Sequence, residues 1–198
     1  MARQVKKSVS DALGEVRGKS MLGERRAPQD CGDIGLRIAR DGTWYYRDSA
    51  IGRRPLVKLF ASVLRREKDG RYFLVTPAEK ALVHVEDAPF LAVAMEVKGS
   101  GKRQRVTFRT NLDETVEAGP EHPFSFRVEK CGGFIPFVLV RDGLQARLTR
   151  PVYYELVAVA AAETKEGGKE MGVWSGGAFF PFPASVPPGK DEAAPLAL

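Results

Sequence analysis

An internal repeat constrains the fold of this chain more than any other feature of its 198 residues. Each copy has the order strand, Arg-Asp-Gly, strand, Arg-Pro and apolar helix. The Arg-Asp-Gly tripeptides stand at residues 40–42 and 141–143, and the Arg-Pro dipeptides at residues 54–55 and 150–151. Asp-Gly favours a hairpin turn because glycine accepts a positive φ and aspartate tolerates it. Proline suits the first turn of a helix. The repeat therefore predicts two related halves.

The two expected helices differ in how much of their surface is apolar. The first is expected from residue 56 to about residue 66, and its apolar side chains share one face. They are Leu56, Leu59, Phe60, Val63 and Leu64. The second, from residue 152 to about residue 162, is apolar nearly all round. That pattern predicts a helix that is buried on most sides.

Together with the strands of the repeat, the body is expected to contain about ten short strands, and residues 72–76 and 82–86 show the alternation of apolar and polar residues that is typical of strands. Turn residues such as Gly99-Ser100-Gly101 separate neighbouring segments and predict hairpins. Because strands joined by local hairpins form antiparallel sheets, the predicted fold class is α+β. Each half is expected to be a mostly antiparallel curled sheet packed around one apolar helix.

The boundary between the halves is expected near Ala88-Pro89, which gives an N-terminal α+β domain at 31–88 and a C-terminal α+β domain at 89–182. Residues 1–30 are expected to be a flexible N-terminal segment, because glycines interrupt its one apolar pattern. Residues 183–198 are expected to be a disordered tail, because prolines recur there. Phe179, Phe180 and Phe182 are expected to dock on the body, since three rings are costly to leave in water.

The formal net charge of the chain is +6 at pH 7. This charge is compatible with anionic partners, although plain solvation of the surface also explains it. The longest apolar run, residues 156–162, falls short of the roughly 20 residues of a membrane span. The N-terminus lacks the apolar stretch of a secretory signal. We therefore expect a cytoplasmic protein without membrane contact. Cys31 and Cys131 have no neighbours at metal-binding spacing, so they are interpreted as free thiols, and no metal or cofactor is expected.

Two short motifs resemble functional loops but lack essential residues. Gly99-Ser100-Gly101-Lys102 has neither the earlier glycine nor the Ser or Thr after the lysine that a phosphate-binding loop needs. Trp174-Ser175-Gly176-Gly177 lacks the glycine that precedes the serine of a nucleophile elbow. No catalytic constellation is recognisable, so an enzyme is not expected. An unrecognised hydrolase that uses His122, a loop residue, is kept as an alternative.

Aromatic and basic residues gather between residues 44 and 54. The set contains Trp44, Tyr45, Tyr46, Arg47, Arg53 and Arg54. Such residues stack bases and hold phosphates in nucleotide sites. The alternative is a strand with one buried aromatic side chain, followed by a solvated surface segment.

Several blocks, in order along the chain, resemble one protein family. They are Cys31-Gly32-Asp33-Ile34, Arg40-Asp41-Gly42-Thr43-Trp44, Phe73-Leu74-Val75-Thr76-Pro77 with Glu79-Lys80, and Glu86-Asp87-Ala88-Pro89-Phe90. The family is the proteobacterial domain-of-unknown-function family twelve eighty-five, and the resemblance covers residues 31–162 and 174–182. It implies a two-domain α+β fold in which each sheet wraps a helix, and a link to signal transduction or ligand sensing. It implies no catalytic residues.

The first functional hypothesis is a non-enzymatic ligand-sensing or regulatory protein in signal transduction. It binds a small anionic molecule between the two repeated domains, since domain interfaces favour pockets. A regulatory protein is the other kind of partner considered. The residues chosen for the ligand site are Asp33, Arg40, Trp44, Arg54, Asn111 and His122. The alternatives are a nucleic-acid-binding protein that uses the basic body, and the hydrolase.

Overall fold

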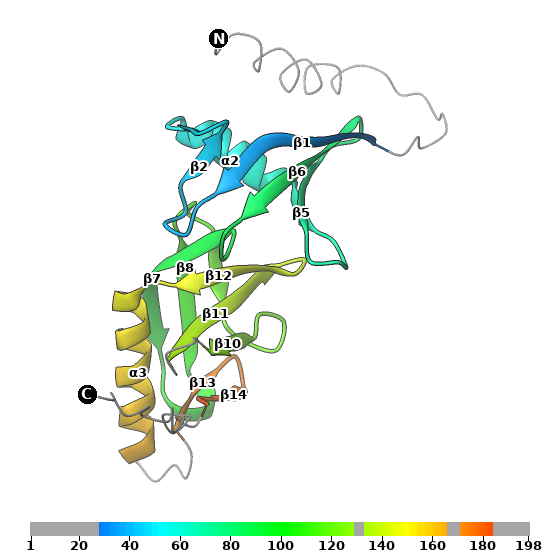
Figure 1. The fold of residues 1–198 in the computed structure, drawn as a ribbon. Helices are drawn as coiled ribbons and strands as arrows, with labels where there is room; N and C mark the ends of the chain where they lie inside the picture. Colours follow the sequence, from blue (N-terminus) through cyan, green and yellow to red (C-terminus); the bar gives the residue numbers. More distant parts are fainter. Residues whose placement is uncertain (1–27, 129–132, 166–170, 184–198) are drawn as a thin grey trace, which may run out of the picture.

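The computed structural model describes residues 28–128, 133–165 and 171–183 of the chain. Most of the expected N-terminal segment (1–30) and of the expected tail (183–198) lies outside these described residues, as does Cys131. The described residues form two six-stranded sheets, one two-stranded sheet and two α-helices (Figure 1). Within this part of the chain, no helix has the length and apolarity that a membrane crossing needs.

The N-terminal sheet has the strand order β3-β2-β1-β6-β5-β4. Its central pair, β1 and β6, is parallel, and every other pair of neighbours is antiparallel. Helix α2 (Arg54–Val63) lies between β3 and β4 in the chain. The strands are β1 (Gln29–Ile38), β2 (Trp44–Tyr46), β3 (Ser49–Ala50), β4 (Leu64–Arg66), β5 (Tyr72–Val75) and β6 (Glu79–Val85).

The C-terminal sheet has the order β10-β11-β12-β7-β8-β9, and only its β7 and β12 are parallel neighbours. Helix α3 (Arg150–Lys165) follows the last strand, and a short hairpin of β13 and β14 follows the helix. The strands are β7 (Phe90–Lys98), β8 (Arg105–Thr110), β9 (Thr115–Glu117), β10 (Phe124–Val128), β11 (Phe134–Arg141), β12 (Leu144–Leu148), β13 (Gly172–Ser175) and β14 (Ala178–Pro181), and a 3₁₀ turn, η2, spans Gly101–Arg103.

The two large sheets share one topology. Each consists of two three-stranded meanders, and the first strand of the first meander pairs in parallel with the last strand of the second. The expected two related halves, mostly antiparallel and each with one helix, are therefore confirmed. The Arg-Asp-Gly copies, however, are not equivalent in this topology, because one joins the first two strands of its sheet and the other joins the last two. Helix α2 likewise lies between two meanders, whereas α3 follows both.

Both Asp-Gly pairs form the hairpin turns that the sequence predicts, with different geometry. Asp142 and Gly143 both have positive φ, 43° and 75°, as a two-residue type I′ loop requires. In the first copy only Gly42 has a positive φ, 81°, and its N–H donates to the carbonyl of Ala39 at 2.9 Å. This is a longer loop in which glycine takes the left-handed position after a tight turn. The dipeptide predicted a turn at each place but did not determine its type.

Helix α2 is shorter than expected, since it ends at Val63 and the next three residues form β4. Leu64 is fully buried, and as a strand residue it pairs with Leu74 of β5. Arg65 and Arg66, which complete the strand, are both exposed. Leu59, expected on the buried face, is exposed. The antiparallel pairing of β4 with β5 thus overrides the helical periodicity after Val63.

Helix α3 is less buried than its composition predicted. Val152, Leu156 and Ala160 are buried, and the helix packs against β7 and β13. Tyr154 on another side is 67% exposed. The prediction of burial on most sides was therefore wrong, because this helix covers the sheet with one face only.

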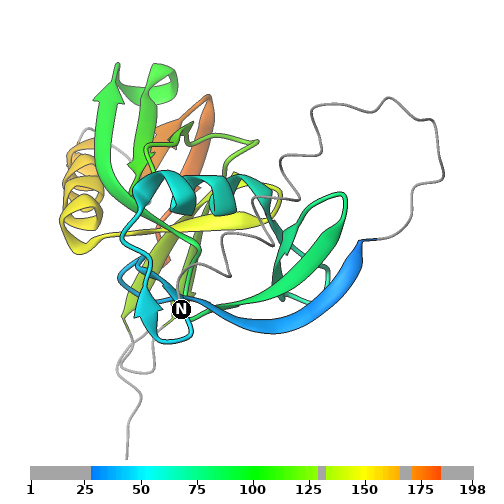
Figure 2. The ribbon, with the colours of Figure 1, turned by 90° about the horizontal axis from the view of Figure 1, so that it is seen from above.

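The buried apolar side chains of both halves form one cluster, which includes Leu36 and Trp44 from the N-terminal sheet and Phe108 and Val138 from the C-terminal sheet. Seen from above in Figure 2, α2 lies beside the strands of the C-terminal half as well as those of its own sheet. The surface of contact between the halves therefore combines a shared apolar core with the polar side chains at its rim.

Candidate functional site

The two Arg-Asp-Gly turns lie at the contact between the halves. The carbonyl of Arg40, in the first turn, accepts a hydrogen bond from Nη2 of Arg147 at 3.3 Å. Nη2 of Arg141, which opens the second turn, donates to the carbonyl of Ala61 in α2 at 2.8 Å. The repeated motif thus provides polar contacts between the halves in addition to its hairpins.

One group at this contact, the Asp113 cluster, consists of Arg54, Lys58, Arg109 and Asp113. Arg54 Nη2 and Lys58 Nζ lie 2.9 Å and 2.7 Å from the same oxygen, Asp113 Oδ2. Arg109 Nη1 lies 3.7 Å from Oδ1. Arg54 and Lys58 share a face of α2 because they are four residues apart, whereas Arg109 comes from β8 and Asp113 from the turn after it. Both halves therefore contribute cations to one carboxylate.

The electrostatics of the Asp113 cluster are strongly asymmetric. Hydrogen bonds from Lys58 and then from Arg54 lower the pKa of Asp113 from 3.8 to about 2. Three cations nevertheless face one carboxylate, so two positive charges are not neutralised within the cluster. The Asp113 side chain is 44% exposed. A solvent-accessible excess of positive charge is a place where a dissolved anion is attracted.

A second group, the Asp87 cluster, consists of Asp87, Arg127 and Arg147. Arg127 Nη1 lies 2.7 Å from Asp87 Oδ1, and Arg147 Nη1 lies 3.2 Å from Oδ2. The second contact is an ion pair whose alignment is too poor for a hydrogen bond. The Asp87 side chain is only 6% exposed, and it stands in the short link between β6 and β7. This cluster therefore fixes the link between the halves.

Three of the residues predicted for a ligand site lie at the contact between the halves. Arg54 belongs to the Asp113 cluster. Asn111 Oδ1 accepts a hydrogen bond from the N–H of Leu91 at 3.1 Å. A Cβ at Gly42 would lie only 2.7 Å from Asn111 Nδ2, so the first turn packs closely on this amide. The main chain of Arg40 is held there by its bond to Arg147.

The other three predicted residues are placed elsewhere. Trp44 is 1% exposed, so its indole is a core side chain and cannot stack on a ligand. Asp33 Oδ2 lies 2.8 Å from Nε2 of His84, and this contact lowers the pKa of Asp33. Nδ1 of His122 contacts the carbonyl of Leu139 at 3.1 Å, within the C-terminal half. The structure therefore does not bring the six residues into one site.

Two family models match the chain in succession. The N-terminal domain of DUF1285, a domain of unknown function, matches residues 24–88, and the C-terminal domain of the same family matches residues 89–182. The chain belongs to the DUF1285 family. The resemblance predicted from the sequence is thus confirmed, and the two models meet between β6 and β7.

Solved structures agree with this assignment. The crystal structure of a DUF1285 family protein from Silicibacter pomeroyi DSS-3 is 39% identical, with a TM-score of 0.71, and the match covers 86% of this chain and 93% of that one. A DUF1285 family protein from Shewanella baltica OS155 is 28% identical, with a TM-score of 0.50, over 64% of this chain and 92% of that one. The search of curated proteins gave no match.

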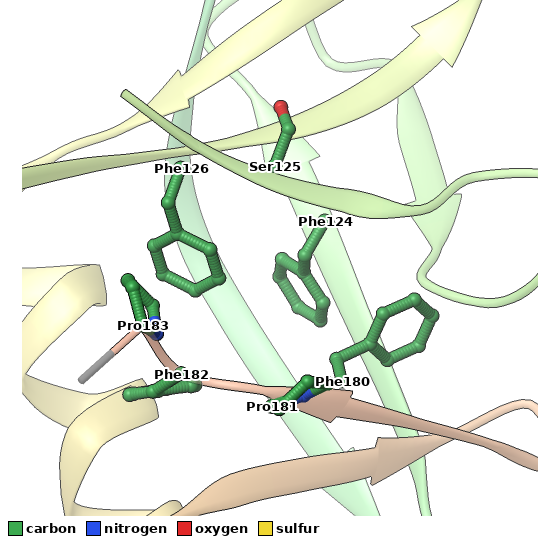
Figure 3. A pocket seen from close by; sticks show the side chains of 7 residues that line it. All are labelled: Phe124, Ser125, Phe126, Phe180, Pro181, Phe182 and Pro183. Carbon is green, nitrogen blue, oxygen red and sulfur yellow. The ribbon is translucent and has the colours of Figure 1, made fainter. Parts of the chain in front are cut away.

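This DUF1285 chain also has an aromatic pocket of about 400 Å³ on its C-terminal half (Figure 3). The rings of Phe124 and Phe180 meet edge to face at 5.1 Å, and those of Phe126 and Phe182 lie 5.3 Å apart. The lining residues are Phe124, Ser125, Phe126, Phe180, Pro181, Phe182 and Pro183. Among the described residues, the lining contains no ionisable side chain, so it offers no group for acid–base chemistry.

The hairpin that carries these phenylalanines is fastened to the body. Phe179 packs on Trp174, with ring centroids 5.3 Å apart. The hydroxyl of Ser175 donates to the carbonyl of Ala118 at 2.6 Å and accepts from the N–H of Val106 at 2.8 Å. The predicted docking on the body is confirmed for Phe180 and Phe182, whose rings contact Phe124 and Phe126 of β10, whereas Phe179 packs on Trp174 within the hairpin itself.

Three members of the Asp113 cluster were not among the residues predicted from the sequence, namely Lys58, Arg109 and Asp113. The spacing of Arg54 and Lys58 was a usable signal, because residues four apart on a helix share a face. Nothing in the sequence indicated that the turn after β8 would lie against α2, since that contact depends on how the halves pack. Among the described residues, no group of three or more His, Cys, Asp or Glu is arranged to hold a metal ion.

Proposed function

We propose that this DUF1285 protein is a non-enzymatic ligand-sensing protein that binds a small anion at the Asp113 cluster. The observation that carries the proposal is the convergence of Arg54, Lys58 and Arg109 on the single carboxylate of Asp113. The cluster is accessible to solvent and retains excess positive charge. An anion bound there contacts side chains of both halves.

The location of the cluster supports a regulatory role. Arg54 and Lys58 extend from α2, and the same helix accepts the hydrogen bond from Arg141 through Ala61. An anion that engages these cations therefore acts on a helix that holds the halves together. A ligand that binds two arrangements of such a contact with different affinity shifts the balance between them. In this proposal, the ligand-induced shift between the two arrangements of the halves is the signal that the protein transmits.

The test is a thermal-shift screen followed by calorimetry on the full chain, with pyrophosphate, nucleotides and organic acids as probes. A ligand at 100 times its dissociation constant adds about 2.7 kcal/mol to stability, which raises the melting temperature by several degrees. Arg54→Ala should weaken binding of the strongest probe at least tenfold, about 1.4 kcal/mol. An unchanged affinity in Arg54→Ala would contradict the proposal.

The matched control is Arg71→Ala. Arg71 is also an exposed arginine with an aspartate partner, Asp69, at 2.7 Å, but it lies away from α2 in the turn before β5. Its loss should leave the affinity for the probe unchanged. An equal loss of affinity in both variants would mean that the probe responds to overall charge. A duplex DNA probe distinguishes the nucleic-acid alternative, whose affinity would fall steeply with added salt.

A further inference from the structure

We propose that Asp113 is an internal competitor for its own cations and that the ligand that displaces it carries a phosphate group. This inference rests on the proposed function, because it concerns the same site. It adds the chemical class of the ligand and the residue that regulates access to the site.

The geometry of the Asp113 cluster shows a mismatch between donors and acceptors. Arg54 and Lys58 both approach Oδ2 of Asp113, while Arg109 lies farther away, at 3.7 Å from Oδ1. A carboxylate has two oxygens for these three cations. A phosphate group offers three free oxygens and nearly two negative charges. It can therefore give each cation its own acceptor, which the aspartate cannot.

The turn that carries Asp113 does not depend on the carboxylate. The N–H of Asp113 donates to the carbonyl of Thr110 at 3.0 Å, and the N–H of Thr110 donates to the carbonyl of Glu114 at 2.8 Å. The hydroxyl of Thr110 accepts from the N–H groups of Leu112 and Glu114 at 3.3 Å and 3.0 Å. Because the backbone is held by these bonds, a rotation of the Asp113 side chain releases its cations without opening the turn.

The Asp113 carboxylate also sets the concentration that a free anion must exceed in order to bind. A group on the same chain competes at an effective concentration on the order of millimolar or more. A free monocarboxylate offers the cations nothing that Asp113 does not already offer, so it must exceed this concentration to bind. A phosphomonoester brings the extra charge and the third oxygen, so it displaces the Asp113 carboxylate at a lower concentration.

The experiment compares methyl phosphate with acetate, two probes that share a methyl group, by calorimetry at about pH 8, where a phosphomonoester is a dianion. Wild type should bind methyl phosphate at least tenfold more tightly than acetate. Equal affinities of wild type for methyl phosphate and acetate would overturn the inference that the ligand carries a phosphate group. Asp113→Asn should bind methyl phosphate at least tenfold more tightly than wild type. Asparagine suits this position because it tolerates the positive φ of 66° found there.

Asp69→Asn is the matched control, since it removes an exposed carboxylate that has one arginine partner and should leave both affinities unchanged. If Arg54→Ala weakens binding but Asp113→Asn does not strengthen it, Asp113 is no competitor and this inference is overturned while the proposed function stands. If Arg54→Ala and wild type bind methyl phosphate equally, the proposed function falls. If neither wild type nor Asp113→Asn binds methyl phosphate, the inference that the ligand carries a phosphate group is overturned, whereas the proposed function is overturned only if the organic acids of the screen fail as well.

Discussion

The Asp87 cluster and the Asp113 cluster have similar composition and opposite character. Each places an aspartate between basic side chains at or near the contact of the halves. Asp87 is 6% exposed and joins strands of one sheet to the link between the halves, whereas Asp113 is 44% exposed and joins a helix of one half to a turn of the other. Burial therefore separates the two, because only an exposed pair can exchange its carboxylate for a dissolved anion without leaving a buried charge unpaired.

The energetics of ion pairs also distinguish the Asp87 cluster from the Asp113 cluster. Removing one partner of a buried pair leaves the other charge in a medium that solvates it poorly, which is strongly destabilising. Exposed pairs contribute little, because water and salt screen them. We infer that the Asp87 cluster serves stability and that the Asp113 cluster is available for binding.

The largest effect is expected for Asp87→Ala. The change leaves Arg147, which is mostly buried, and Arg127 without their shared anion. We expect a loss of about 3 kcal/mol in the free energy of unfolding, at the low end of the range for buried pairs because Arg127 is half exposed. Urea unfolding followed by circular dichroism measures it. A urea midpoint equal to that of wild type would contradict a stabilising role of the Asp87 cluster.

The next effect is expected for Arg147→Ala, which removes one of two cations from Asp87 together with the hydrogen bond to the carbonyl of Arg40. We expect a loss of about 1–3 kcal/mol in the free energy of unfolding. Arg109→Ala is its matched control, since it removes the most distant cation from Asp113. That control should leave the urea midpoint within error of wild type. A larger loss of unfolding free energy in Arg109→Ala than in Arg147→Ala would mean that the Asp113 cluster, and not the Asp87 cluster, serves stability.

A smaller effect is expected for Asp113→Asn at neutral pH. Its partners are exposed, so water replaces the lost interactions and the urea midpoint should stay close to that of wild type. This variant should combine only slightly lowered stability with tighter binding of methyl phosphate. A clear loss of stability would mean that the Asp113 carboxylate holds the halves together.

The smallest effect is a change in the dependence of stability on pH. The folded-state pKa of Asp113 lies near 2, below its ordinary value of 3.8. Its contribution to stability is therefore complete above about pH 4 and is lost as the pH falls through 2. The small difference between the urea midpoints of wild type and Asp113→Asn should close over this interval. Parallel curves throughout would show that the carboxylate gains nothing from its cations on folding.

The sequence predicted the local features of the fold best. The Asp-Gly turns and the helix starts at Arg54-Pro55 and Arg150-Pro151 depend on residues that are close in the chain. Strand β4 was missed because its pairing with β5 competes with a continuing helical pattern. The parallel pairing of β1 with β6 was missed as well, since it joins residues about fifty positions apart.

The candidate site was predictable only in part. Arg54 was chosen because it stands in an aromatic and basic segment, and it belongs to the Asp113 cluster. Trp44 was chosen from the same segment, but alternation along a strand does not tell which side faces the core, and this side chain is buried. Lys58 and Asp113 meet only when the two halves pack, so local patterns contained no information on their contact.

The most direct test of the division between the clusters is an NMR titration of the full chain with methyl phosphate. Signals of the side-chain nitrogen groups report each cation separately in one experiment. Signals of Arg54, Lys58 and Arg109 should shift, and those of Arg127 and Arg147 should not. Equal shifts in both clusters would show that the Asp113 cluster is not the specific binding site, and so would unchanged signals of Arg54 and Lys58 while the probe binds elsewhere.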